Sequence, residues 1–136
     1  MNNEALGSMF DDLGVPVEGN AGHWQISLEH ARIICLTDET HNRMRFIAPI
    51  RETADMDAAE LTRCLEANFY TALDIKYSIA DGVLWSAFMH PLAELTESQA
   101  RDALEQVYHG VLTYGSSYSS SNLSFPTSQD RKGKMH

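Results

Sequence analysis

The chain has 136 residues, 43% of them hydrophobic and 21% charged, which is the composition of one globular domain with a core of its own. Its formal net charge of −9 repels phosphate backbones and therefore argues against a nucleic-acid partner. No stretch approaches the roughly 18 consecutive apolar residues of a membrane span, so we expect no insertion into a membrane.

The first half of the chain predicts one helix and three strands. Apolar residues recur at the spacing of one helical face over residues 3–13. The segment 17–22 is rich in Gly and Asn and indicates a turn. Three later segments have the alternation or the short apolar runs of strands, and they are 24–28, 33–36 and 44–48. Pro49 predicts an edge position or the end of the third strand, because proline has no N–H for strand pairing.

A helix and a hairpin follow in the second half. Asp57 and Glu60 have the spacing of a capping box, which predicts a helix over residues 58–73. Asp81-Gly82 predicts a tight hairpin turn, because a type I′ turn needs positive φ at both central residues. The two strands that this turn joins are 77–79 and 83–89.

The last predicted helix begins at a second capping box, formed by Thr96 and Gln99, and ends before Gly115. The resulting order, α-β-β-β-α-β-β-α, predicts an α+β fold with a five-stranded antiparallel sheet. We expect a single domain over residues 1–115 and a flexible, Ser-rich C-terminal tail over residues 116–136.

The strand over 83–89 is apolar on both faces, which is typical of a strand that is covered on both sides. The predicted helices do not suffice to cover both faces of the sheet. Apolar residues are therefore expected on an uncovered face, and they are Leu84, Phe88, Ile33 and Ile47. Such a patch marks a protein interface, and a homodimer is the simplest way to cover it.

The sequence contains no motif that is typical of a catalytic or metal site. His23, His30 and His41 are the best metal candidates, and we interpret them as exposed loop residues. Cys35 and Cys64 lie in a predicted strand and helix, which indicates buried, reduced thiols in a cytoplasmic protein. We expect no enzymatic activity, no cofactor and no metal, while an acid–base pair assembled from distant segments stays open.

Five short patterns indicate a family resemblance. In chain order they are Met9-Phe10-x-x-Leu13-Gly14-Val15, Trp24-x-Ile26-x-Leu28, Leu61-x-x-x-Leu65-Glu66-Ala67-Asn68, the turn Asp81-Gly82, and the closing helix from Leu104 to Leu112. Together they cover roughly residues 5–115 and resemble the Tir chaperone family of type III secretion chaperones. The related YbjN-like proteins share this fold.

The resemblance implies a homodimer that binds an extended segment of a client protein, by strand addition or through apolar patches. The implied client-binding residues are Phe10, Leu13, Trp24, Ile26, Ile33 and Cys35. The implied dimer interface consists of Phe69, Tyr77, Trp85 and Phe88. A YbjN-like regulatory or ligand-sensing domain and an unrecognised enzyme are the two alternatives.

Overall fold

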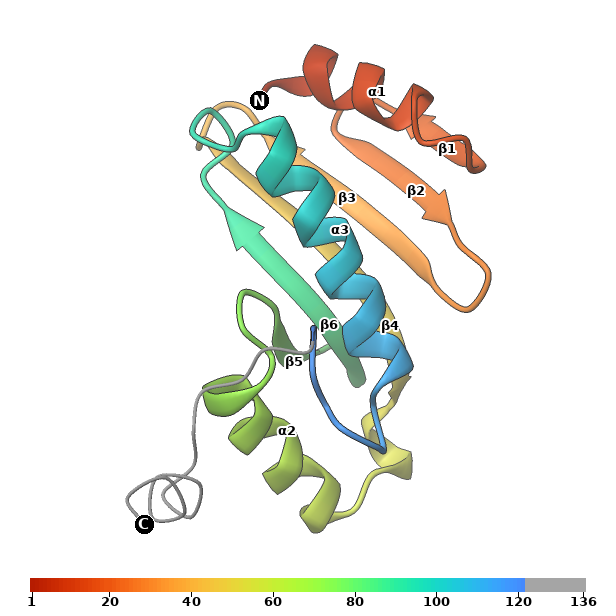
Figure 1. The fold of residues 1–136 in the computed structure, drawn as a ribbon, viewed down its shortest axis with the longest axis vertical. Coiled ribbons are helices and arrows are strands. Elements are labelled where there is room, and N and C mark those ends of the chain that lie inside the picture. The colour runs from red at the N-terminus through yellow and green to blue at the C-terminus, as the bar shows by residue number, and fades with distance from the viewer. Residues whose placement is uncertain (122–136) are drawn as a thin grey trace, which may run out of the picture.

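The computed structural model describes residues 1–121, in which three α-helices, one short 3-10 helix and six strands occur. Figure 1 shows α3 lying along the sheet, with α1 and α2 at opposite ends of the molecule. In chain order the elements are α1 (Asn3–Asp11), β1 (Val17–Asn20), β2 (His23–Ser27), β3 (Arg32–Asp38), β4 (Arg43–Glu52), η1 (Thr53–Asp55), α2 (Ala58–Tyr70), β5 (Lys76–Ala80), β6 (Val83–His90) and α3 (Glu97–Leu112).

The strands form one antiparallel sheet in the order β1-β2-β3-β4-β6-β5, which confirms the predicted α+β class. The prediction of five strands is wrong, because β1 is an additional edge strand inside the segment predicted as a turn. It pairs with β2 from Val17 opposite Ile26 to Asn20 opposite His23. Most of its side chains are exposed, so it lacks the buried alternation by which a sequence pattern indicates a strand.

Strand β4 continues past Pro49 to Glu52, so the prediction that this proline ends the strand is wrong. The pairing of β4 with β6 shifts register between Pro49 and Arg51. A bulge of this kind is one of the few places in a sheet that tolerate a residue without an N–H. The added length brings Arg51 to α2, where its Nη1 atom lies 3.2 Å from Glu60 Oε2.

The predicted helix caps and the predicted turn are confirmed. Asp57 accepts a hydrogen bond of 2.8 Å from the backbone N–H three residues later. Thr96 and Gln99 form the reciprocal bonds of a capping box, at 2.9 and 3.1 Å. Asp81 and Gly82 have φ values of 53° and 74°, as a type I′ turn requires.

The core lies between one face of the sheet and the helices. The ring of Phe10, from α1, packs on Trp24 at 5.2 Å and on Phe46 at 6.4 Å between centroids. Phe46 stacks in turn on Phe88 of β6 at 6.2 Å. These four rings join α1 to three strands of the sheet, so α1 belongs to the same core as α3.

The opposite face of the sheet, within residues 1–121, has no helix packed over it. Three of the residues predicted on an uncovered face, Leu84, Phe88 and Ile33, are instead buried under the helices. Of that set Ile47 alone points to the open side, because its neighbours Phe46 and Ala48 belong to the core and side chains alternate along a strand.

Two side chains attach α3 closely to the sheet. Ser86 Oγ donates a hydrogen bond of 2.9 Å to Val107 O, and Tyr77 Oη donates one of 2.9 Å to Gly110 O. A Cβ atom on Gly110 would come within 2.6 Å of Ser86 Oγ, so this position has no room for a side chain. The close approach fixes the lateral position of α3 on the sheet.

At the β5 edge of the sheet, α2 is anchored by one asparagine. Asn68 Oδ1 accepts a hydrogen bond of 2.8 Å from Tyr77 N, and Asn68 Nδ2 donates one of 3.1 Å to Tyr77 O. This pair of bonds reproduces what a neighbouring strand would offer to the backbone of Tyr77.

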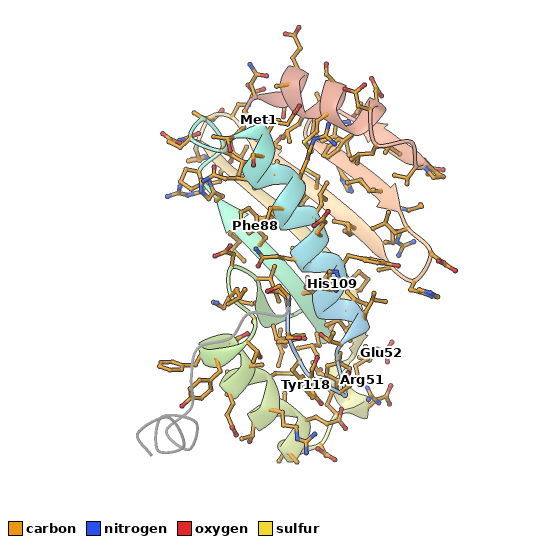
Figure 2. All side chains as sticks on the ribbon, viewed as in Figure 1. Met1, Arg51, Glu52, Phe88, His109 and Tyr118 are labelled. Atoms are coloured by element: carbon orange, nitrogen blue, oxygen red, sulfur yellow. The ribbon has the colours of Figure 1, made fainter. Side chains whose placement is uncertain are left out.

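The chain after α3 is part of the domain. Tyr118 and Ser120 are buried, with 6% and 1% of their surface exposed. Thr71 donates its hydroxyl to Tyr118 O and accepts from Ser120 N at 3.2 Å. Figure 2 shows Tyr118 between α2 and the end of α3. The predicted domain end and flexible tail are therefore wrong for residues 116–121, and the remaining predicted tail, 122–136, lies outside the described residues.

Candidate functional site

A groove of about 370 Å³ lies between α3 on one side and the segments around α1 and β2 on the other. Most of its lining is apolar, and these residues are Leu13, Val15, Ile26, Leu28, Leu104 and Tyr108. Three charged residues complete the lining, and they are Glu29, Arg101 and Glu105. A concave apolar surface with a few charged groups is the usual form of a binding site.

The first flank of the groove comes from the connection between α1 and the sheet. The backbone reverses at Gly14, whose φ of 73° lies in the left-handed region that glycine adopts without strain. Leu13 and Val15 on either side of it line the groove. Ile26 of β2 and Leu28 after it add two more side chains, because alternate residues of an extended segment share one face.

The second flank is one side of α3. Arg101, Leu104, Glu105 and Tyr108 are spaced i, i+3, i+4 and i+7, which places them along one face of a helix. Arg101, Glu105 and Tyr108 were not predicted as site residues. The signal that identifies them is this spacing around Leu104, together with the polar residues that border an otherwise apolar stripe.

The charged residues make the margin of the groove acidic on balance. Arg101 Nε lies 3.6 Å from Glu97 Oε2, one turn earlier on α3, and both side chains are largely in water. An exposed pair of this kind contributes little stability, but the Glu97 carboxylate offsets the positive charge of Arg101. Glu29 and Glu105 then remain at the margin. The groove therefore suits an apolar segment that has a basic residue beside it.

The structure separates the six predicted client-binding residues into two groups. Leu13 and Ile26 line the groove, where Leu13 is partly exposed and Ile26 is buried with 1% of its surface exposed. The other four are in the core with 7% or less of their surface exposed, and they are Phe10, Trp24, Ile33 and Cys35. Those four side chains form no surface of the folded protomer, because they face α1 and α3 and not solvent. A client could reach these four side chains only if the protomer opened, so the client-binding set stays a prediction.

Both cysteines are buried thiols. Burial raises the pKa of Cys35 to about 12. Burial also raises the pKa of Cys64, and the nearby Glu60 carboxylate adds to that effect. Neither thiol has the lowered pKa of a nucleophile. Burial likewise raises the pKa of the Tyr77 hydroxyl to about 12.

These raised pKa values predict a loss of stability in alkali. Cys35 and Tyr77 keep their protons in the folded protein at pH values where the unfolded chain has lost them. The stability they contribute is complete below about pH 9 and is lost as the pH rises toward 12. We expect the free energy of unfolding, measured with urea, to fall by about 2–4 kcal/mol between pH 8 and pH 11. The double variant Cys35→Ala/Tyr77→Phe should lose most of this pH dependence, and an unchanged slope would refute the assignment.

The predicted dimer residues also lie in different places. Tyr77 and Phe88 are buried, with 4% and 7% exposed, and Trp85 is half-buried on the open side of the sheet. Phe69 is 71% exposed on α2. The interface predicted from these four is therefore corrected, because two of them are core residues and the others lie on different surfaces.

Two further large apolar side chains are exposed on α2 and on β5, the strand that α2 packs against. Leu65, one turn earlier on α2, is 70% exposed, and Ile79 of the neighbouring strand β5 is 55% exposed. The residues that α2 buries are the small Cys64 and Ala67. We call Leu65, Phe69 and Ile79 the α2 patch.

A second cavity, of about 490 Å³, lies between the C-terminal half of α3 and the segment that follows it. Gln106 Nε2 donates hydrogen bonds of 2.9 and 2.8 Å to Asp74 Oδ2 and Asp102 Oδ2. Ser120 Oγ donates to Gln106 Oε1 at 3.1 Å. These bonds connect α3, the loop before β5 and the C-terminal segment, so we interpret the polar lining as structural.

The histidines considered as metal ligands do not come together. His23, His30 and His41 are all exposed, and His41 Nδ1 lies 2.7 Å from Asp38 Oδ2. Hydrogen bonds from His41 lower the pKa of Asp38. Within the described residues, no group of three or more His, Cys, Asp or Glu side chains could hold a metal ion. In the same part of the chain, no helix is both long and apolar enough to span a bilayer.

Solved structures with the same arrangement include chaperone complexes. The chain is similar to a chain of the HopA1–SchA chaperone–effector complex, with a TM-score of 0.62 and 11% identity over 82% of this chain and 94% of that chain. It is also similar to a chain of the ExsC–ExsE complex, with a TM-score of 0.58 and 11% identity over 84% and 97%. No family model and no curated protein matches the sequence. The likeness confirms the chaperone-like fold.

Proposed function

We propose that this protein is a non-enzymatic, chaperone-like module that holds an extended segment of a client protein in the groove between α1 and α3. It works as a homodimer in the cytoplasm, without cofactor or nucleic acid. The observation that supports this best is the groove itself, an apolar concavity of about 370 Å³. The fold around it is similar to that of a chain in a chaperone–effector complex.

The position of the groove suggests how a client segment binds. Strand β1 is at the edge of the sheet. Val15, two residues before β1 begins, lines the groove. A client strand that pairs with β1 gains main-chain hydrogen bonds, while its alternate side chains reach toward the partly exposed Val15 and Leu28. Main-chain pairing then supplies affinity for many sequences, and the groove selects those with apolar residues.

The α2 patch supports the homodimer. Three large apolar side chains with 55–71% exposure are on α2 and on β5, two elements in contact with each other. A symmetric contact between two copies covers such a surface with the same surface of the second copy, so no other protein is needed. The groove is lined by α3, β2 and the segment after α1, and no residue of α2 lines it, so two copies joined in this way keep both grooves accessible.

Random 20-residue peptides displayed on phage provide the test of client binding. We expect selection on the wild-type protein to enrich apolar peptides, and their dissociation constants to rise at least tenfold on Leu28→Glu. Leu28 lines the groove and is partly exposed, so the fold should accept glutamate there. An apolar ligand would have to remove water from the glutamate carboxylate, which costs free energy, so the affinity falls.

Gln25→Glu is the matched control. Gln25 is also half-buried and lies three residues earlier, within β2, but it points to the opposite side of the sheet. Its replacement should leave the selected peptides bound within a factor of two. Selection that enriches no peptide, or peptides that bind both variants equally well, would count against a client site in the groove.

A ligand-sensing role of the YbjN-like kind is the second candidate, and the size of the groove favours it. At about 370 Å³ the groove falls within the range of small-molecule sites. A shift in melting temperature with small molecules, and none with the selected peptides, would support this role over client binding.

A further inference from the structure

The side of the sheet opposite to the helices has an apolar centre of its own. In register across three strands, Ile34 lies opposite Ile47, and Ile47 lies opposite Ala87. Beside this row, Trp85 and Met89 of β6 point the same way as Ala87, because side chains alternate along a strand. We call this surface the open sheet face, and its residues are Ile34, Leu36, Arg45, Ile47, Trp85 and Met89.

The helices cover the other side of the sheet. Phe10 of α1 packs on Phe46, which alternates with Arg45 and Ile47. Val107 of α3 accepts its bond from Ser86, which alternates with Trp85. Ile34, Leu36, Ile47 and Trp85 are half-buried by their strand neighbours alone, and Met89 is 55% exposed. Apolar residues that gather on a sheet face in this way are typical of a face that another element covers.

Exposed arginines distinguish this face from the rest of an acidic protein, although Arg43 lies opposite Asp38 in the sheet and interacts electrostatically with Glu94. Arg45 sits in register between Leu36 and Met89. Arg43, two residues earlier on the same face, has one long hydrogen bond, of 3.5 Å, to Asn42 O. Among the described residues, neither Arg43, Arg45 nor Arg32 at the start of β3 has a carboxylate within ion-pair distance.

The acidic residues on the same side lie at the margins. Glu18 is on the edge strand β1, and Asp38 and Glu52 end their strands. Asp38 already binds His41. The centre of the face is therefore apolar and positive, although the chain as a whole has a net charge of −9.

The charge decides which partner fits. Two copies of this chain that meet through the open sheet face would bring arginines against arginines, which is unfavourable in a dry contact. A partner with carboxylates gains charge-assisted, bidentate bonds from the same guanidinium groups. Trp85 offers a fixed apolar anchor, because its Nε1 donates a hydrogen bond of 3.1 Å to Ala80 O.

We propose that the open sheet face docks an amphipathic helix of another protein, whose apolar stripe covers Ile47 and Trp85 and whose flanking acidic residues pair with Arg43 and Arg45. A helix is the element that most often covers the free side of a sheet. This site is separate from the groove, so its occupation does not depend on whether the groove holds a client.

A pair of designed peptides tests the proposal. Each has 16 residues with leucines at i, i+3, i+4 and i+7, flanked by glutamates in one peptide and by lysines in the other. We expect fluorescence anisotropy to show saturable binding of the glutamate peptide to the full chain, with the lysine peptide at least tenfold weaker. The double variant Arg43→Glu/Arg45→Glu should weaken the glutamate peptide at least tenfold.

Two further variants locate the binding. Arg63→Glu changes an exposed arginine of α2 and should leave the affinity within a factor of two. Leu28→Glu, in the groove, should do the same. The proposal is overturned if the glutamate peptide does not bind, if both peptides bind equally, or if Leu28→Glu and not the arginine reversal abolishes binding. Circular dichroism and melting temperature confirm that each variant is folded.

Discussion

Replacing Leu65 and Phe69 together with glutamate should convert the proposed homodimer to a monomer at every concentration that sedimentation velocity can reach. Each side chain is about 70% exposed in the protomer, so the contact between copies and not the core loses them. Burial of a large apolar side chain contributes about 1.5–3 kcal/mol. Two such losses in each copy correspond to a dissociation constant raised at least about 100-fold.

Met89→Glu is the matched control for this prediction. Met89 is 55% exposed, close to the value for Ile79, but it belongs to the open sheet face. Its replacement changes the charge in the same direction and should leave the protein dimeric. A wild-type protein that sediments as a monomer, or a Leu65→Glu/Phe69→Glu variant that remains a dimer, would contradict the proposal that the α2 patch joins two copies.

Tyr118→Ala should reduce the free energy of unfolding by about 3 kcal/mol, the usual cost of truncating a buried aromatic ring. Tyr118 is 6% exposed, and its ring packs edge to face on Tyr77 at 6.0 Å and on Tyr114 at 5.3 Å between centroids. The effect is large because Tyr77 in turn fastens β5 to α3 through Gly110. Urea denaturation with a two-state fit measures the change.

Ser117→Ala provides the comparison for Tyr118→Ala within the same segment. Ser117 is exposed, and its hydroxyl is bonded to that of Ser119 at 2.9 Å. A surface change of this kind should stay within about 0.5 kcal/mol of the wild type. If Tyr118→Ala changed the free energy of unfolding equally little, the segment after α3 would not be part of the core.

Signals that act over a few residues allowed most elements to be predicted. The caps at Asp57 and Thr96 and the turn at Asp81-Gly82 depend on a side chain or a φ angle close by, and the structure has all of them. Strand β1 gave no such signal, because an edge strand with exposed side chains has no apolar alternation. Its existence depends on pairing with β2, which a local pattern does not contain.

The orientation of an amphipathic element is harder to predict than its existence. Helix α2 has large apolar residues on one side and the small Cys64 and Ala67 on another. The side that α2 turns toward β5 carries the small residues, while Leu65 and Phe69 are exposed. Similarly, the pattern in β2 and β3 grouped Trp24 with Ile26 and Ile33 with Cys35, without showing which face the helices cover.

The segment after Gly115 shows the limit of composition as a guide. Its serines predicted exposure, and Ser116 and Ser117 are indeed exposed. Tyr118 is buried against the ring of Tyr77 and bonded by the Thr71 hydroxyl. Ser120 is buried where its hydroxyl bonds Gln106. Those partners lie elsewhere in the chain, so only the folded arrangement shows that this segment belongs to the domain.

The asparagine that anchors α2 has a consequence for assembly. Because Asn68 satisfies both backbone groups of Tyr77, the β5 edge offers an incoming strand an interrupted row of partners. Within residues 1–121 no side chain bonds the backbone of β1 in this way, so an added strand finds free partners at that edge. Sheets with two free edges can pair edge to edge without limit. When one edge is blocked, pairing at the other edge ends after a single addition. A protein that presents a free edge to other chains thereby avoids forming fibres of its own.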